Sequence, residues 1–168
     1  MKNTFYNRAC PPSRMFGSRR GMTVIEIFVI IAVVGVLLLI VLPQFSKTRE
    51  NQVLKSAVAD VLSSLDKARS QTLASFNSSE YGVRFEASQV IIFKGTTFSS
   101  GAAENEAMAI TSPAGITNVT LNSVSGASGD MYFNRLSGSP SKSGMLTIST
   151  DSYSKIITIG ATGAVSSN

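Results

Sequence analysis

The sequence predicts an α+β protein in which a long N-terminal α-helix packs on a C-terminal antiparallel β-domain. Three observations support this fold class. The run from Ile27 to Leu42 is uninterrupted apolar sequence, and the stretch from Ser46 to Ser75 repeats apolar residues at helical spacing without Gly or Pro. After Phe76 the composition changes to Ser, Thr, Gly, Asn and β-branched residues in short alternating runs between turn formers. With 168 residues, the chain has room for about one domain.

The N-terminal segment holds the excess positive charge of the chain, whose formal net charge is +5. From Met22 onward, ten basic and ten acidic side chains balance. Residues 1–21 contain no acidic side chain and five basic ones, which are Lys2, Arg8, Arg14, Arg19 and Arg20. This location indicates a targeting segment rather than a nucleic-acid-binding face, so we expect no nucleic-acid partner.

The apolar run that follows is long enough to span a lipid bilayer. Together with Met22 to Ile25, the run from Ile27 to Leu42 reaches about the 20 residues that a spanning helix needs. The cations before the run outnumber Lys47 and Arg49 after it, which Glu50 partly offsets. The positive-inside rule then predicts a single-pass membrane protein with its N-terminus inside and the remainder outside.

The junction before the run is Ser18-Arg19-Arg20-Gly21-Met22-Thr23-Val24-Ile25-Glu26, and no small-x-small signal-peptidase site follows Leu42. This junction resembles the class III signal of type IV prepilins and type II secretion pseudopilins. In that family a membrane peptidase cuts after the glycine and then N-methylates the new first residue. The resemblance implies cleavage between Gly21 and Met22, N-methylation of Met22, and a leader peptide at residues 1–21. It also implies a single-pass inner-membrane protein with a cytoplasmic N-terminus and a periplasmic C-terminal domain. The family usually has Phe where Met22 stands.

Glu26 would be the fifth residue of the processed chain. A carboxylate at the centre of a bilayer costs about 2.5 to 3.5 kcal/mol, and Glu26 lies one turn from the cytoplasmic end, where the cost is lower. It could simply offset the positive end of the helix dipole. The resemblance implies instead an assembly role, in which Glu26 pairs with the α-amine of Met22, first its own and then that of a neighbouring subunit.

Gly35 and Pro43 fall where pilins commonly carry residues that weaken the helix. The resemblance implies that the segment between them can extend when the subunit enters a filament. Simple tolerance of both residues in a membrane helix is the alternative.

The helix is expected to run from Thr23 to about Ser75, with only a bend at Pro43. Apolar residues recur every three or four positions from Val53 to Leu73, which predicts one buried face. We therefore expect a transmembrane and assembly half at residues 22–46 and an amphipathic half at residues 47–76.

Residues 77–168 are expected to form the β-rich domain. Two stretches, Gly95 to Glu106 and Asn122 to Gly129, are expected to be mobile surface loops. The predicted strands are Tyr81 to Phe85, Val90 to Lys94, Met108 to Ile110, Val119 to Leu121, Met131 to Phe133, Met145 to Thr150, Lys155 to Ile159 and a final short one at Ala164 to Val165.

The C-terminal pattern narrows the resemblance. Phe133 to Gly138, a variable loop, Gly144 to Ser149, Lys155 to Gly160 and then Gly163 to Val165 resemble the C-terminal half of the GspH/FimT family of minor pseudopilins and minor pilins. The processed chain would have no cysteine, so the C-terminal disulfide loop common in major pilins would be absent. A minor subunit is therefore favoured.

The composition excludes several kinds of catalytic and metal site. The chain has no His and one Cys, which excludes a serine–histidine–acid triad, histidine-ligated metal and a Cys-rich zinc site. The acidic residues are scattered except for Glu104-Asn105-Glu106, which is weak evidence for calcium. We expect no enzymatic activity, no metal and no cofactor.

The resemblance implies a structural subunit of a type II secretion pseudopilus, incorporated at the tip of a filament that drives protein export. Its expected partners are prepilin peptidase, other pseudopilins or pilins through the N-terminal helix, the inner-membrane assembly platform and the lipid bilayer. Two alternatives remain open. One is a minor type IV pilin that primes pilus assembly for adhesion, motility or DNA uptake, and the other is a membrane-tethered periplasmic domain of unknown activity.

Overall fold

The computed structural model describes the backbone of residues 21–168 and every side chain in that range except those of residues 42 and 43. The chain divides into two units, Met1–Ile40 and Val41–Asn168. The helix α1 (Val24–Leu73, 50 residues) contributes to both units. The predicted helix is therefore confirmed to within two residues at each end.

The strands all lie in the second unit. Their bounds are β1 (Tyr81–Glu86), β2 (Gln89–Lys94), β3 (Glu106–Ala109), β4 (Gly115–Leu121), β5 (Val124–Gly126), β6 (Gly129–Tyr132), β7 (Gly144–Ser149), β8 (Ser154–Ile159) and β9 (Val165–Ser167). They form two sheets, one in the order β3-β2-β1-β6 and the other in the order β5-β4-β7-β8-β9. Every strand pair is antiparallel. The α+β fold class is thus confirmed.

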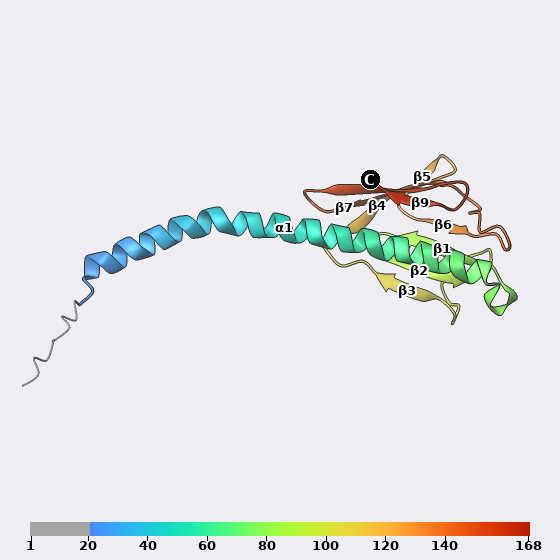
Figure 1. Ribbon diagram of the computed structural model, residues 1–168, viewed down its shortest axis with the longest axis horizontal. Helices are drawn as coiled ribbons and strands as arrows, with labels where there is room; N and C mark the ends of the chain where they lie inside the picture. Colours follow the sequence, from blue (N-terminus) through green and yellow to red (C-terminus); the bar gives the residue numbers. More distant parts are fainter. Residues whose placement is uncertain (1–20) are drawn as a thin grey trace, which may run out of the picture. The chain divides into compact units, whose positions relative to one another are not determined.

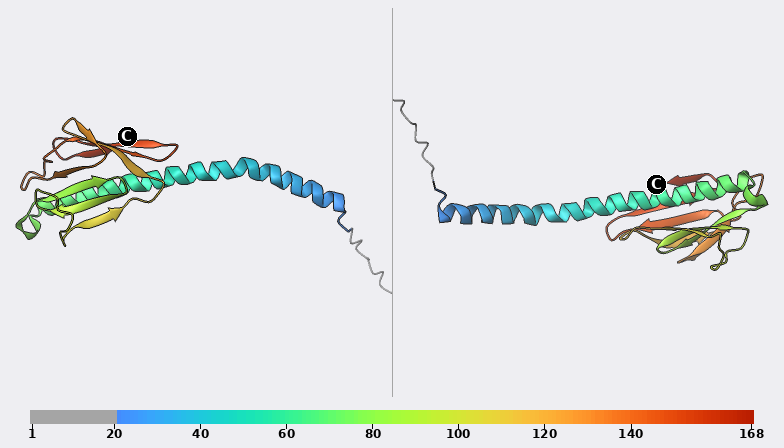
Figure 2. Two further views of the ribbon diagram at one scale, coloured as in Figure 1. Left: turned by 180° about the vertical axis from the view of Figure 1, so that it is seen from behind. Right: turned by 90° about the horizontal axis from the view of Figure 1, so that it is seen from below.

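Strands of both sheets lie alongside the second half of α1 (Figures 1 and 2). The helix contributes a stripe of buried residues at three- and four-residue spacing, as predicted: Leu54, Ala57, Val58, Val61, Leu65 and Ala68. Each sheet turns alternate side chains toward this stripe. The first sheet buries Val83, Phe85, Val90, Ile92 and Met131, and the second buries Val119, Leu121, Leu146, Ile148, Ile157 and Ile159. One apolar core therefore joins the helix to both sheets.

A buried hydroxyl fixes the end of α1 against the first strand. Thr72 donates its hydroxyl proton to the carbonyl of Ala68 at 2.9 Å and accepts a hydrogen bond from the backbone N–H of Tyr81 at 2.9 Å. A short 3-10 helix, η1 (Phe76–Ser78), turns the chain between them. The polar group at this buried position is satisfied by the backbone on both sides.

Strand β5 was not predicted, because its residues lie in the stretch expected to be a mobile loop. It pairs with β4 through a two-residue hairpin, in which Leu121 faces Val124. Asn122 and Ser123 both have positive φ, at 46° and 66°, as the tightest hairpin turns require. Ser is an uncommon residue at such a position, so the sequence carries a weak turn signal there. The last strand also lies one residue later than predicted, at Val165–Ser167.

The other stretch expected to be a mobile loop, Gly95 to Glu106, ends at the first residue of β3, and an aromatic side chain anchors the remainder. Phe98 packs edge-on against Phe93 of β2, with ring centroids 5.6 Å apart. The guanidinium of Arg84 lies 5.1 Å from the centre of the Phe98 ring, within the range of a cation–π contact. Phe98 thus covers the face of the first sheet that points away from α1.

Gly144 opens β7, the central strand of the second sheet, where it faces Leu121 of β4 and Ile159 of β8. A Cβ atom there would lie 2.9 Å from the carbonyl carbon of Thr120 and closer still to its oxygen. We expect Gly144→Ala to lower the free energy of unfolding by about 1 to 3 kcal/mol, because backbone cannot move aside as a side chain can. Urea unfolding of the full-length protein in detergent measures this.

The matched control is Gly101→Ala, because a Cβ at Gly101 would meet nothing within 4 Å. Equal stability of the two variants would contradict the close approach of β7 to β4.

Candidate functional site

The start of α1 is held by a side-chain cap. The backbone N–H of Glu26 donates to the hydroxyl oxygen of Thr23 at 3.3 Å, and the N–H of Ile27 donates to the Thr23 carbonyl at 3.3 Å. Thr23 is therefore the N-cap residue, and it satisfies a backbone donor that the helix leaves free. Sequence reasoning missed this role, although Thr23 and Glu26 have the spacing of a capping box.

Glu26 lies in the first turn of α1. A negative charge at this position is stabilised by the positive end of the helix dipole. Its side chain is exposed. Within residues 21–168, its carboxylate has no hydrogen-bond donor and no basic partner within 4.0 Å. The charge is available to a group from outside this part of the chain.

Gly21 and Met22 precede the helix and have no regular secondary structure. The Met22 side chain is 63% exposed, and a Cβ at Gly21 would meet nothing within 4 Å. The peptide bond between Gly21 and Met22 is therefore exposed, and it lies outside the hydrogen-bonded part of the helix. Exposed backbone of this kind is the sort that a peptidase can bind.

The part of α1 that follows is apolar on every side. By length and composition the helix could cross a membrane, and none of its most apolar 18-residue stretch is buried inside the protein. This stretch is therefore not part of the protein's core, although an N-terminal signal sequence has the same properties. Exposed Val, Ile, Leu and Phe side chains continue from Val24 to Val41.

Gly35 and Pro43 lie within α1, which is assigned as helix through both residues. A Cβ at Gly35 would meet nothing within 4 Å. The side chain of Pro43 lies outside the described part of the structure. The role of these two residues in helix flexibility stays a prediction.

Several charged side chains of the second unit form local pairs. Asp130 of β6 lies 3.7 Å from Arg84 Nη1 and 3.9 Å from Lys142 Nζ. Glu106 pairs with Lys67 of α1, with its Oε2 atom 2.6 Å from Lys67 Nζ. The negative charge of Glu106 is therefore balanced by Lys67 and needs no metal ion. Among residues 21–168, no three Asp, Glu, Cys or His side chains gather closely enough to hold a metal ion.

Comparisons with protein-family models, with curated proteins and with solved structures found no match to this chain. A functional interpretation therefore rests on the residues at the start of α1 and on the surface that follows them. These features are an exposed peptide bond between Gly21 and Met22, the carboxylate of Glu26 one turn later, and the apolar surface of the following stretch of α1, which water solvates poorly.

We expect Thr23→Ala to fray the first turn of α1, because the backbone N–H of Glu26 loses its acceptor. A lost N-cap costs about 1 kcal/mol, which corresponds to roughly fivefold faster amide exchange at Glu26 and Ile27. Hydrogen exchange of the full-length protein in detergent micelles measures this rate. Thr48→Ala is the control, since the Thr48 hydroxyl donates to the Gln44 carbonyl in mid-helix and caps nothing. Equal acceleration of the first turn by both variants would contradict the cap.

Proposed function

We propose that this protein is a minor pseudopilin, a non-catalytic structural subunit of a type II secretion pseudopilus. Prepilin peptidase cuts it between Gly21 and Met22 and N-methylates Met22. The processed chain remains in the inner membrane until it enters a filament that drives protein export. Its partners are other pseudopilins, through the N-terminal part of α1, and the inner-membrane assembly platform.

The observation that carries this proposal is the exposed apolar stretch of α1. Burial of apolar surface yields roughly 25 cal/mol per Å², so a helix of this kind needs another apolar environment. The stretch from Val24 to Val41 finds none within the described chain. Lipid supplies that environment before assembly, and the helices of other subunits supply it afterwards. One surface therefore serves both states.

The free carboxylate of Glu26 supports an assembly role in particular. When helices pack and exclude water, burial of an unpaired charge costs free energy. A charge of opposite sign about 4 Å away stabilises it by roughly 4 kcal/mol at an effective dielectric constant of 20. Cleavage before Met22 creates such a partner, because the new α-amine is positively charged. Glu26 of one subunit and Met22 of a neighbour then fix the register between them.

The second unit supports a structural role on the surface of the filament. Its strands are tied to α1 by the shared core, so a force on the helix moves the whole unit. The C-terminal pattern that resembles GspH/FimT proteins includes positions with clear structural reasons in this fold. Phe133 is fully buried, Gly144 lies against the backbone of β4, and Gly163 has a φ of 79° in the turn before β9.

We expect Gly21→Ala to block processing in cells that contain prepilin peptidase. Intact-mass and N-terminal peptide analysis of the protein from native membranes measures this. The unaltered protein should begin at N-methylated Met22, whereas the variant should retain residues 1–21. Unprocessed protein in both cases would leave a membrane-tethered domain as the better hypothesis.

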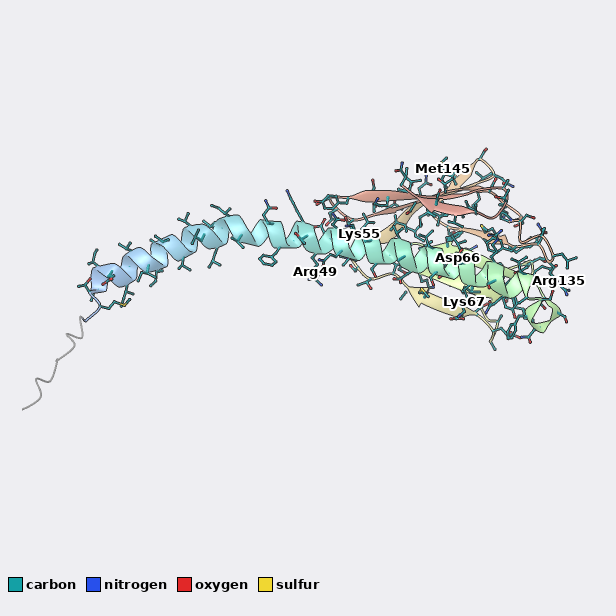
Figure 3. The ribbon with its side chains drawn as sticks, viewed as in Figure 1. Arg49, Lys55, Asp66, Lys67, Arg135 and Met145 are labelled. Carbon is teal, nitrogen blue, oxygen red and sulfur yellow. The ribbon has the colours of Figure 1, made fainter. Side chains whose placement is uncertain are left out.

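We expect Glu26→Gln to leave cleavage between Gly21 and Met22 unchanged but to reduce incorporation into filaments by tenfold or more. The loss follows because an amide cannot neutralise the α-amine of a neighbour. Asp66→Asn is the matched control, since Asp66 is an exposed carboxylate on the second half of α1 (Figure 3). Cross-linking of the variants to other filament subunits measures incorporation. Equal incorporation of the two variants would remove Glu26 from the assembly mechanism.

A further inference from the structure

We propose that a polar hollow beside α1, immediately after its apolar stretch, binds the phosphate group of an anionic phospholipid. The hollow measures about 270 Å³ and lies within the second unit. Its polar walls come from Lys47, Thr48, Asn51, Gln52 and Lys55 of α1, and Tyr153 closes it from the turn between β7 and β8. The inference depends on the membrane insertion contained in the proposed function.

The two lysines share one face of the helix. Lys47, Asn51 and Lys55 are spaced four residues apart, so they lie one above another. Side chains on a helix lean toward its N-terminus, which here is the direction of the apolar stretch. Lys55 therefore extends back toward Asn51 and Lys47. Arg49 points to another side, because two residues correspond to about 200° of rotation.

The charges of this hollow are uncompensated. In the part of the chain that the structure describes, neither Lys47 nor Lys55 has a carboxylate within 4.0 Å or a side-chain hydrogen bond. The nearest carboxylates along α1 are those of Glu50 and Asp60, and Asp151 lies in the turn that carries Tyr153. The ammonium group of Lys47 and the amide of Asn51 one turn later offer several donors to one anion, and Lys55, about 12 Å further along the helix, adds longer-range attraction. A phosphate, with its multiple acceptor oxygens, matches that set.

The depth of the hollow favours a lipid phosphate over a free one. A helix rises 1.5 Å per residue, so Lys47 lies about 8 Å beyond Leu42, the last residue of the apolar run. The polar headgroup layer on each side of a bilayer is roughly 5 to 7 Å thick. Lys47 therefore lies at the outer limit of the headgroups, and its side chain leans back into them. Lys55 lies about 12 Å further from the bilayer, where it attracts the anionic surface without contacting a headgroup.

Tyr153 also fits a position at the membrane surface, where an aromatic ring with a polar tip is favoured. Two hydrogen bonds hold its turn in place. The N–H of Thr150 donates to the carbonyl of Tyr153 at 2.8 Å, and the N–H of Tyr153 donates to the Thr150 hydroxyl at 3.1 Å. The wall of the hollow is therefore formed before any ligand arrives. Figure 3 labels Lys55 and Arg49 on this stretch of α1.

The test uses the full-length processed protein in nanodiscs of phosphatidylcholine, with or without phosphatidylglycerol. Native mass spectrometry after release into detergent measures which lipid stays bound. We expect preferential retention of phosphatidylglycerol, and a loss of about 10- to 30-fold in its apparent affinity for the double variant Lys47→Gln/Lys55→Gln. The control is Arg49→Gln/Lys94→Gln, which removes the same charge from exposed positions that do not line the hollow.

Three results would overturn the inference. The first is equal retention of the two lipids, and the second is an equal loss in both double variants, which would indicate diffuse attraction. The third is binding of inorganic phosphate, but not phosphatidylglycerol, in a manner that depends on Lys47 and Lys55. Carbonate extraction of the same membranes separates this inference from the proposed function. If the protein is released, both fail, whereas a retained protein with no lipid preference removes only the lipid site.

Discussion

The buried stripe of α1 is the contact on which the second unit depends. Leu54, Val61 and Leu65 are almost completely buried, and they meet side chains from both sheets. Neither sheet pairs with the other edge to edge, so their strands are joined mainly through this shared core. Small antiparallel sheets are marginally stable without a packed face. The helix therefore acts as the common surface on which two separate sheets become one folded unit.

The same helix changes its pattern where the first unit ends. From Leu54 onward its apolar residues occupy one side, whereas from Val24 to Val41 they occupy every side. A one-sided stripe can be satisfied by the chain's own strands, but an all-round apolar surface needs contacts that encircle it. Within residues 21–168 nothing covers that stretch, so its environment must come from outside this part of the chain. This requirement, and not any catalytic group, is the main support for the proposed membrane-anchored assembly subunit.

Local patterns predicted much of this, and long-range contacts account for what they missed. The length of α1 followed from apolar spacing and from the absence of Gly and Pro after Ser46. Strand β5 was missed because Asn122 and Ser123 form a tight hairpin turn without the glycine that marks such turns. The cap at Thr23 was visible in the sequence but overlooked. The hollow at Lys47 could not be predicted, because it exists only where folding brings Tyr153 beside α1.

The apolar stretch is bounded by charges that the described chain leaves unpaired. Glu26 lies at its beginning, the first charged residue after it is Lys47, and no charged residue lies between them. Under the two proposals, these ends have opposite effects on the same subunit. Contact between Lys47 and lipid phosphate holds the processed subunit in the membrane, whereas pairing between Glu26 and a neighbour's α-amine draws it into the filament. Entry into the filament must then exchange one charge pair for another. A subunit would leave the bilayer only where a neighbour offers its amine, so assembly would be confined to the growing end.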